Sequence, residues 1–359
     1  MENMSVETQA FFFGVYWNLF YREDPMADLF INTAVLHIFD YSSGNEVMSQ
    51  SSLNLEDAVI EDYVTKHLNK CINDIRIRKG YFNEGSSFLS LVQGLNDQKY
   101  NFTDFSIQAA GTLSEYLKST ASQSYDVLFA DYRLDDVPYV AMILLENQKA
   151  YTHETKTEDG IVANTILLQH SILPSTGKKI NTFALINTIT MEIQYVDQTN
   201  WNNGDISVLQ EMVLDCTSEK SREEVLDEVS EVVTEVAEKC DENPTLLLSK
   251  YKNYMKNSAE EKDTVSTEDL AMHVFNDSEE LQDTFISTTV EHEIPKEVEV
   301  PKKAVSRKMK NQKIRTDTGI ELTFPTEYSE NPDKIEFINN PDGTISIEIK
   351  HIVKITNRG

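Results

Sequence analysis

Two apolar runs separated by a pair of aspartates constrain the fold of this chain more than any other feature. The runs are Tyr125–Leu134 (YDVLFADYRL) and Val137–Glu146 (VPYVAMILLE), and Asp135 and Asp136 lie between them. Apolar runs of this length joined by a short polar turn predict a β-hairpin that is buried on both faces. Pro138 stands near the start of the second run, where a strand best tolerates a missing N–H. We expect this hairpin to form the centre of a sheet.

The patterns on either side of the hairpin predict an α+β domain over residues 28–200, built on a mixed sheet with helices. Apolar residues at helical spacing predict helices, and short apolar runs bounded by turn residues predict strands. The expected helices are 54–75, which ends in the basic run 76–80, then 86–95 and 102–117. The expected strands besides the hairpin are 31–41, 46–51, 161–170, 182–187 and 192–196.

Residues 1–27 form an apolar N-terminal extension that contains the run Phe11–Tyr21 (FFFGVYWNLFY). Glu2 and Glu7 precede the run where a signal peptide would carry Lys or Arg, and no small-residue cleavage pattern follows it. We interpret the run as a docked segment or a short helix. No stretch reaches the roughly 18 apolar residues that span a bilayer, so no membrane partner is expected.

Beyond residue 200 the pattern changes to an acidic helical region over 201–294. Ser221 with Glu224 predicts a capping box at the start of a helix whose valines share one face. Residues 295–312 are rich in charge, valine and proline, and predict a basic linker or arm. Residues 313–359 alternate apolar and polar side chains and predict a small antiparallel β unit, with a turn at 340–343.

The charge of the chain is strongly acidic but unevenly distributed. The net charge of −28 excludes a general nucleic-acid coat protein. Residues 201–300 hold 26 Asp and Glu against eight Lys and Arg, whereas residues 301–359 hold eight acidic and 11 basic residues. The sign of the local charge therefore changes near Pro301.

The cysteines and the known catalytic motifs give no sign of an enzyme. Cys71, Cys216 and Cys240 are widely spaced without a CxxC motif, which is typical of a reducing cytosol and predicts a cytoplasmic protein. The sequence lacks a Gly-rich phosphate loop, a GKS/T motif and a G-x-S-x-G motif, and no histidine pair has metal-site spacing. We expect neither a cofactor nor an enzyme activity.

Three aspartates near the hairpin turn raise one catalytic alternative. Asp131, Asp135 and Asp136 could hold Mg²⁺ in a nuclease-like site, because that ion prefers a few carboxylates. Acidic residues are also common in solvated turns that have no chemistry. We favour the solvated turn, and expect no metal site.

The strongest chemical signal is a basic strip without any acidic residue between Lys302 and Arg315. Such a strip can neutralise several phosphates of DNA, and its binding would depend on salt. Charge balance with the acidic region is the alternative. The residues of the strip are Lys302, Lys303, Arg307, Lys308, Lys310, Lys313 and Arg315.

A secondary basic cluster lies around the end of the expected helix 54–75. Basic residues suit a helix C-terminus in any case, so this cluster is the weaker candidate for DNA contact. Its residues are Lys66, Lys70, Arg76, Arg78 and Lys79.

The acidic helical region supports a second hypothesis, in which the chain is an adaptor that binds a basic protein or a DNA-processing protein. Acidic runs are more often solvated faces that keep a chain in solution. The valine-rich helices and the apolar N-terminus are also compatible with a homodimer.

Seven short segments, none of them a catalytic signature, follow one another in an informative order. They are Ile31–His37, Lys79–Phe82, Phe102–Leu117, Asp126–Leu145, Gly319–Phe324, Ile335–Phe337 and Thr344–Ile347. In this order the chain resembles the bacterial nucleoid-associated protein family of the NdpA type, over roughly residues 28–355. The resemblance implies a non-catalytic, cytoplasmic protein that associates with nucleoid DNA. The family has no established catalytic residues to carry over, so the candidate site residues rest on charge alone.

Overall fold

The computed structural model describes residues 28–41, 44–120, 124–197, 207–276, 278–341 and 344–356. The chain forms two compact units. The N-terminal unit comprises residues 1–73 and 79–218, and the C-terminal unit comprises residues 74–78 and 219–359. The predicted segment at Phe11–Tyr21 lies outside the described residues, as do residues 342 and 343 of the predicted turn at 340–343.

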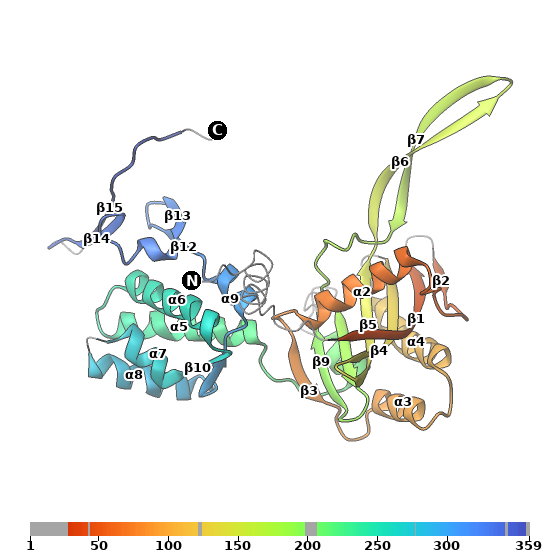
Figure 1. Cartoon of the computed structure of the whole chain (residues 1–359), viewed down its shortest axis with the longest axis horizontal. Helices are drawn as coiled ribbons and strands as arrows, with labels where there is room; N and C mark the ends of the chain where they lie inside the picture. The colour runs from red at the N-terminus through yellow and green to blue at the C-terminus, as the bar shows by residue number, and fades with distance from the viewer. Residues whose placement is uncertain are drawn as a thin grey trace, which may run out of the picture. The chain divides into compact units, whose positions relative to one another are not determined.

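The N-terminal unit is built on a seven-stranded sheet in the order β2-β1-β4-β5-β8-β9-β3 (Figure 1). Its strands are β1 (Leu29–Asp40), β2 (Asn45–Val47), β3 (Arg78–Tyr81), β4 (Tyr125–Leu134), β5 (Val137–Glu146), β8 (Phe183–Asn187) and β9 (Glu192–Val196). From β2 to β9 in this order, each strand pairs antiparallel with the next. With the helices below, the α+β class predicted from the sequence is confirmed.

The predicted central hairpin is strands β4 and β5, paired from Tyr125 with Glu146 to Leu134 with Val137. Asp135 and Asp136 have positive φ angles of 50° and 64°, which fit a tight two-residue hairpin turn. Aspartate is one of the few residues with a side chain that tolerates this conformation. The hairpin lies between β1 and β8, so both of its edges are hydrogen-bonded.

Helices cover both faces of the sheet. Helices α3 (Ser87–Asn96) and α4 (Phe102–Thr120), with the π-helical segment Val208–Leu214, share one core with Val127 and Phe129 of β4. Alternate residues of β4, Leu128 and Ala130, are buried on the opposite face. Helix α2 (Ala58–Ile72) lies on that face, and Figure 1 shows it on the other side of the sheet from α4.

The end of helix α2 differs from the prediction, which continued it to residue 75 and the basic run. The helix ends at Ile72, because Asn73 caps it: the backbone N–H and the side-chain Nδ2 of Asn73 both donate to the carbonyl of Asn69. Residues 78–81 then form strand β3. Gly80 in this strand packs against the backbone of Thr217, where a Cβ atom would lie 2.0 Å from the carbonyl oxygen.

A long two-stranded ribbon extends from the N-terminal unit (Figure 1). It consists of β6 (Gln148–Glu158) and β7 (Ile161–Ile172), which pair antiparallel around a turn at Asp159 and Gly160. The sequence predicted only the second of these strands. The first was missed because its side chains are mostly polar, without the apolar alternation that indicates a half-buried strand.

His37, on strand β1, is buried as a neutral ring. The Ser49 N–H donates to its Nδ1 at 3.0 Å, so Nδ1 carries no proton, and Nε2 lies 3.1 Å from the Ser106 hydroxyl. Burial lowers the pKa of His37 from 6.5 to about 4. Protonation would also remove the bond from Ser49. The stability that the neutral ring contributes is complete above pH 6.5 and is lost as the pH falls toward 4.

Between pH 7 and pH 5, the free energy of unfolding of the wild type should fall by about 2 kcal/mol more than that of a His37→Gln variant. Asp126 opposes this trend, because burial raises its pKa to about 6, but it is common to both proteins. Urea unfolding at the two pH values measures the difference. His170→Gln, at an exposed position of the same unit, is the control; an equal effect of both variants would contradict the assignment.

The first four helices of the C-terminal unit are α5 (Arg222–Lys239), α6 (Pro244–Glu261), α7 (Thr267–Val274) and α8 (Glu279–Glu291). The predicted capping box is confirmed, since Ser221 and Glu224 exchange side chain-to-backbone hydrogen bonds at the start of α5. The short strands β10 (Thr264–Ser266) and β11 (Glu297–Glu299) pair beside the helices. Two antiparallel pairs follow, β12 (Asn311–Arg315) with β13 (Glu321–Pro325), and β14 (Ile335–Asn339) with β15 (Ile345–Ile349).

Residues 295–312, predicted as a basic linker or arm, contain strand β11, helix α9 (Lys302–Lys308) and the start of β12. Val298, Val300, Val305 and Met309 are at most 1% exposed and belong to the core of the four helices. The segment is therefore ordered by apolar residues spaced between its charges, a contribution that its overall composition hides. None of the described helices is both long and apolar enough to cross a membrane.

Candidate nucleic-acid interface

Helix α9 and strand β12 order the basic strip so that its side chains have different surroundings. On α9, Val305 and Met309 are four residues apart and lie on the face that is buried in the core. Lys303 and Arg307 are also four residues apart and lie on an exposed face. On β12, Gln312 is buried, so the alternation of the strand exposes Lys313 and Arg315. Lys310, between the helix and the strand, is exposed.

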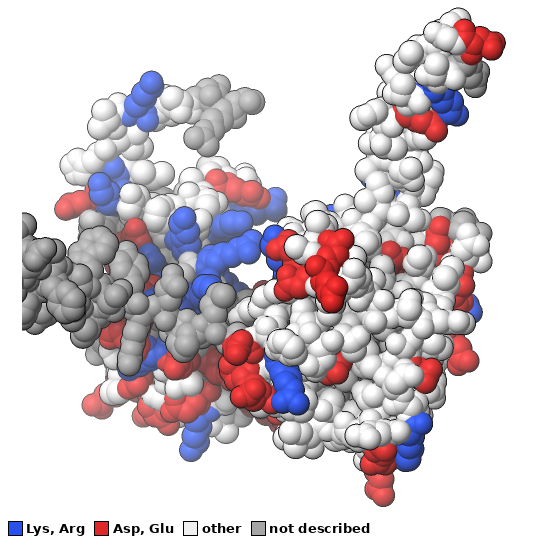
Figure 2. Space-filling model, turned by 45° about the vertical axis from the view of Figure 1, so that its right-hand side comes forward, with Lys and Arg blue, Asp and Glu red and all other residues white. Residues whose placement is uncertain are grey.

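We call these five exposed residues the basic face: Lys303, Arg307, Lys310, Lys313 and Arg315. Within the described part of the chain, no carboxylate forms an ion pair with the first four. Arg315 lies 3.8 Å from Glu321, but both side chains are over 70% exposed, so water screens this pair. Figure 2 shows Lys and Arg side chains gathered on one side of the C-terminal unit, above a zone of acidic side chains.

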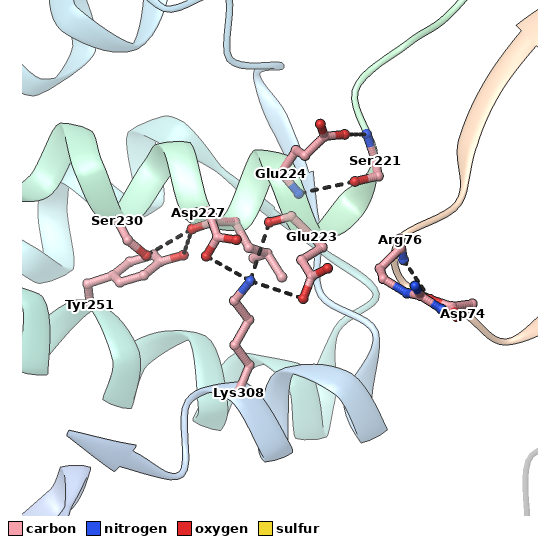
Figure 3. A network of polar contacts seen from close by, with 10 residues as sticks. Asp74, Arg76, Ser221, Glu223, Glu224, Asp227, Ser230, Tyr251 and Lys308 are labelled. Carbon is pink, nitrogen blue, oxygen red and sulfur yellow. Dashed lines mark hydrogen bonds and ion pairs between the residues drawn. The ribbon is translucent and has the colours of Figure 1, made fainter. Parts of the chain in front are cut away.

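The other two residues of the strip bind carboxylates of the same unit. The Lys308 Nζ lies 2.7 Å from an Asp227 oxygen and 3.7 Å from a Glu223 oxygen, and donates to the Glu223 carbonyl (Figure 3). Lys308 is only 24% exposed, so it joins α9 to α5. The Lys302 Nζ lies 2.7 Å from Glu260 on α6. These contacts match the charge-balance alternative for two of the seven residues.

One basic residue near this face was not predicted. Lys252, on α6, donates from Nζ to the Gln312 side chain on β12 at 2.7 Å, and burial lowers its pKa. Only the tertiary fold brings Lys252 beside β12, because 60 residues separate the two partners. No local pattern in the sequence could have identified it.

The residues of the secondary basic cluster are mostly occupied by partners within the protein. Lys66 pairs with Asp62 one helical turn away, and Lys70 donates to the carbonyls of two residues in the loop after β7. Arg76 binds Asp74 through two nitrogens, as Figure 3 shows, and Arg78 pairs with Glu224. Lys79 is exposed on β3.

The three aspartates of the nuclease alternative have structural surroundings. Asp131 is half-buried within β4, and burial raises its pKa. Asp135 accepts a hydrogen bond from the Asp28 N–H at 2.9 Å, and Asp136 forms the hairpin turn. Among the residues that the structure describes, no group of three His, Cys, Asp or Glu side chains could hold a metal ion.

Many acidic side chains of the C-terminal unit lie on its helices. Glutamates occupy the first turns of α5, α7 and α8, where their negative charge interacts favourably with the positive end of the helix dipole. The valines of α5, predicted to share one face, are buried between the helices. The unit therefore presents an acidic helical surface and a basic α9–β12 surface.

Comparison with known proteins identifies the family of the chain. No curated protein matches the sequence. A family model described as "Nucleoid-associated protein YejK" matches residues 35–356, which covers most of the chain, including the sheet, the acidic helices and the basic face. The chain therefore belongs to the family of the nucleoid-associated protein YejK.

Proposed function

We propose that this chain is a non-catalytic nucleoid protein that binds DNA through phosphate contacts of the basic face. The observation that carries the proposal is the division of the basic strip, in which five exposed basic side chains on α9, β12 and the link between them have no close carboxylate in the ranges that the structure describes, whereas Lys302 and Lys308 each lie 2.7 Å from one. Exposed cations without a close carboxylate can release the counterions of DNA, whereas Lys302 and Lys308 are already paired with carboxylates.

Contacts of this kind position a protein on the duplex and do not read its sequence, so we expect weak preference among sequences. The net charge of −28 repels DNA from most of the surface. This repulsion would restrict the approach of the duplex to the basic face. We propose the cytoplasmic nucleoid as the place where this binding occurs.

Binding of the purified protein to a fluorescent duplex over a salt series tests this function. Five phosphate contacts predict a slope of about −4 to −5 in a plot of log affinity against log salt. Because the binding is expected to be independent of sequence, duplexes of unrelated sequence should give similar affinities. Absence of binding even at low salt would contradict direct DNA binding.

The acidic helices favour a second candidate function, in which the chain recruits a basic or DNA-processing protein. Its support is the excess of Asp and Glu over residues 201–300, displayed on a folded helical surface. Under this function the chain reaches the nucleoid through its partner. A protein that does not bind the duplex alone, but binds it in the presence of a basic protein, would favour this candidate.

We also propose that the chain forms a homodimer, which would bring two basic faces to one duplex and raise the avidity of binding. Light scattering of the full chain over a range of concentrations tests this point without DNA. A monomer at the highest concentration would contradict it.

A further inference from the structure

The pairing of the ribbon β6–β7 gives its two faces different chemistry. Residues that face each other across an antiparallel pair lie on the same side of the ribbon, and alternate pairs lie on opposite sides. The pairs on one side are Tyr151 with Leu168, His153 with Ile166, Thr155 with Asn164 and Thr157 with Val162. These four pairs contain no Asp, Glu, Lys or Arg, and we call them the uncharged face; Lys149 follows on the same side at the base of the ribbon, beside the register shift.

The other side of the ribbon carries charge. Its pairs include Glu154 with Thr165 and Lys156 with Ala163, and the Lys156 Nζ lies 3.1 Å from a Glu154 oxygen. Ile161 and Leu167 also belong to this side. The charged groups of this ion pair are well solvated in water, so this side favours exposure to solvent.

The uncharged face exposes large apolar side chains. Tyr151 is 76% exposed, Ile166 74%, Val162 65% and Leu168 41%. An isolated two-stranded ribbon is at best marginally stable in water and needs packing on one face. These four apolar side chains have a combined exposed area of roughly 500 Å², near the upper limit for an apolar patch on the surface of a monomer.

Charge decides which partner fits this face. Residues 148–172 hold two lysines against Glu154, Glu158 and Asp159, so the ribbon does not attract phosphate. The four pairs of this face carry no charged side chain, so a second copy can lie on them without bringing like charges together, although the chain as a whole has a charge of −28. Two such faces would bury about 1,000 Å² in total, which reaches the lower limit of a specific interface.

We propose that the uncharged face of the ribbon packs against the same face of a second copy across a two-fold axis. The same residues would contact each other from both copies, as a two-fold interface requires. Ile166 pairs with His153, which is two residues from Tyr151 on β6. Ile166 and Tyr151 form the apolar centre of the contact. This assignment rests on the homodimer proposed above, and is independent of DNA binding.

A pair of variants at neighbouring positions of β7 tests the assignment. Ile166→Lys places a charge on the uncharged face, and Thr165→Lys places the same charge on the opposite face. Light scattering and sedimentation of the full chain give the dimer dissociation constant. We expect a dimeric wild type, an unchanged Thr165→Lys variant, and at least a tenfold weaker dimer for Ile166→Lys. Circular dichroism should show the same fold in all three, because both positions are exposed and outside the core.

The other outcomes overturn the assignment in distinguishable ways. A monomeric wild type would remove the homodimer together with the ribbon interface. Two variants that both remain dimeric would leave the homodimer and remove the ribbon from its interface. Two variants that both become monomeric would show that the uncharged face has no special role. None of these results depends on the affinity for DNA.

Discussion

Replacement of the five residues of the basic face by glutamine is expected to weaken duplex binding by about 10³-fold at about 0.1 M salt. Each basic side chain that contacts a phosphate releases counterions from the DNA, and its replacement by glutamine removes that release. The magnitude of the slope of log affinity against log salt should therefore decrease by about 4 to 5. All five positions are exposed, so the change removes charge without opening the core. The variant should therefore unfold like the wild type.

A matched control removes the same amount of charge elsewhere. Lysines at five other exposed positions, replaced by glutamine, give the same net charge: Lys99, Lys179, Lys262, Lys296 and Lys334. We expect this control to keep most of the salt slope. If both variants lose affinity equally, net charge rather than the basic face decides binding, and the site assignment fails.

Lys308→Gln separates a residue of the sequence strip from the basic face. Lys308 binds Asp227 and Glu223, so its loss should leave the salt slope nearly unchanged. A drop in slope equal to that of Arg307→Gln would place Lys308 on DNA and contradict the division of the strip.

Phe129→Ala is expected to destabilise the N-terminal unit by about 3–5 kcal/mol. Phe129, on the central strand β4, is fully buried, and its ring packs edge-on against Phe105 of α4 with the centroids 6.3 Å apart. Removal of the ring leaves a cavity between sheet and helix that the packed strands on both sides cannot close. Hydrogen exchange of the amides in β4 and β5, read by mass spectrometry, measures the loss within this unit.

Phe30→Ala is the control for this prediction, because Phe30, on strand β1, is 62% exposed. Its replacement should cost no more than about 0.5 kcal/mol. If the amides of β4 and β5 exchange faster in both variants by the same amount, the central hairpin is not the core of the unit.

The hairpin was predictable because its signal is local. Val127–Ala130 and Ala141–Leu145 are short apolar runs, and the two aspartates between them can adopt the positive φ angles of a tight turn. The end of α2 was not predictable in this way. Its basic residues and Gly80 have the composition of a helix C-terminus, but contact with Thr217, more than a hundred residues away, holds them as a strand.

The basic strip was predictable as charge, because its residues are contiguous in sequence. Its division into paired and exposed residues was not, since the partners of Lys308 lie on α5, over 80 residues earlier. A charge pattern shows which cations are present. Only the fold shows which of them already have a carboxylate.

The assignment of residues 74–78 to the C-terminal unit has a consequence for how the protein is made. Ile77 is 4% exposed, and the Ile75 carbonyl accepts a hydrogen bond from the Glu223 N–H. On the ribosome, this segment emerges before its partners beyond residue 218 have been synthesised, an interval of about ten seconds at ordinary translation rates. During this interval the Ile75 carbonyl lacks the Glu223 N–H that it accepts from in the folded protein. A gene cut at residue 218 would separate residues 74–78 from the rest of their unit, so neither unit is complete as one continuous fragment.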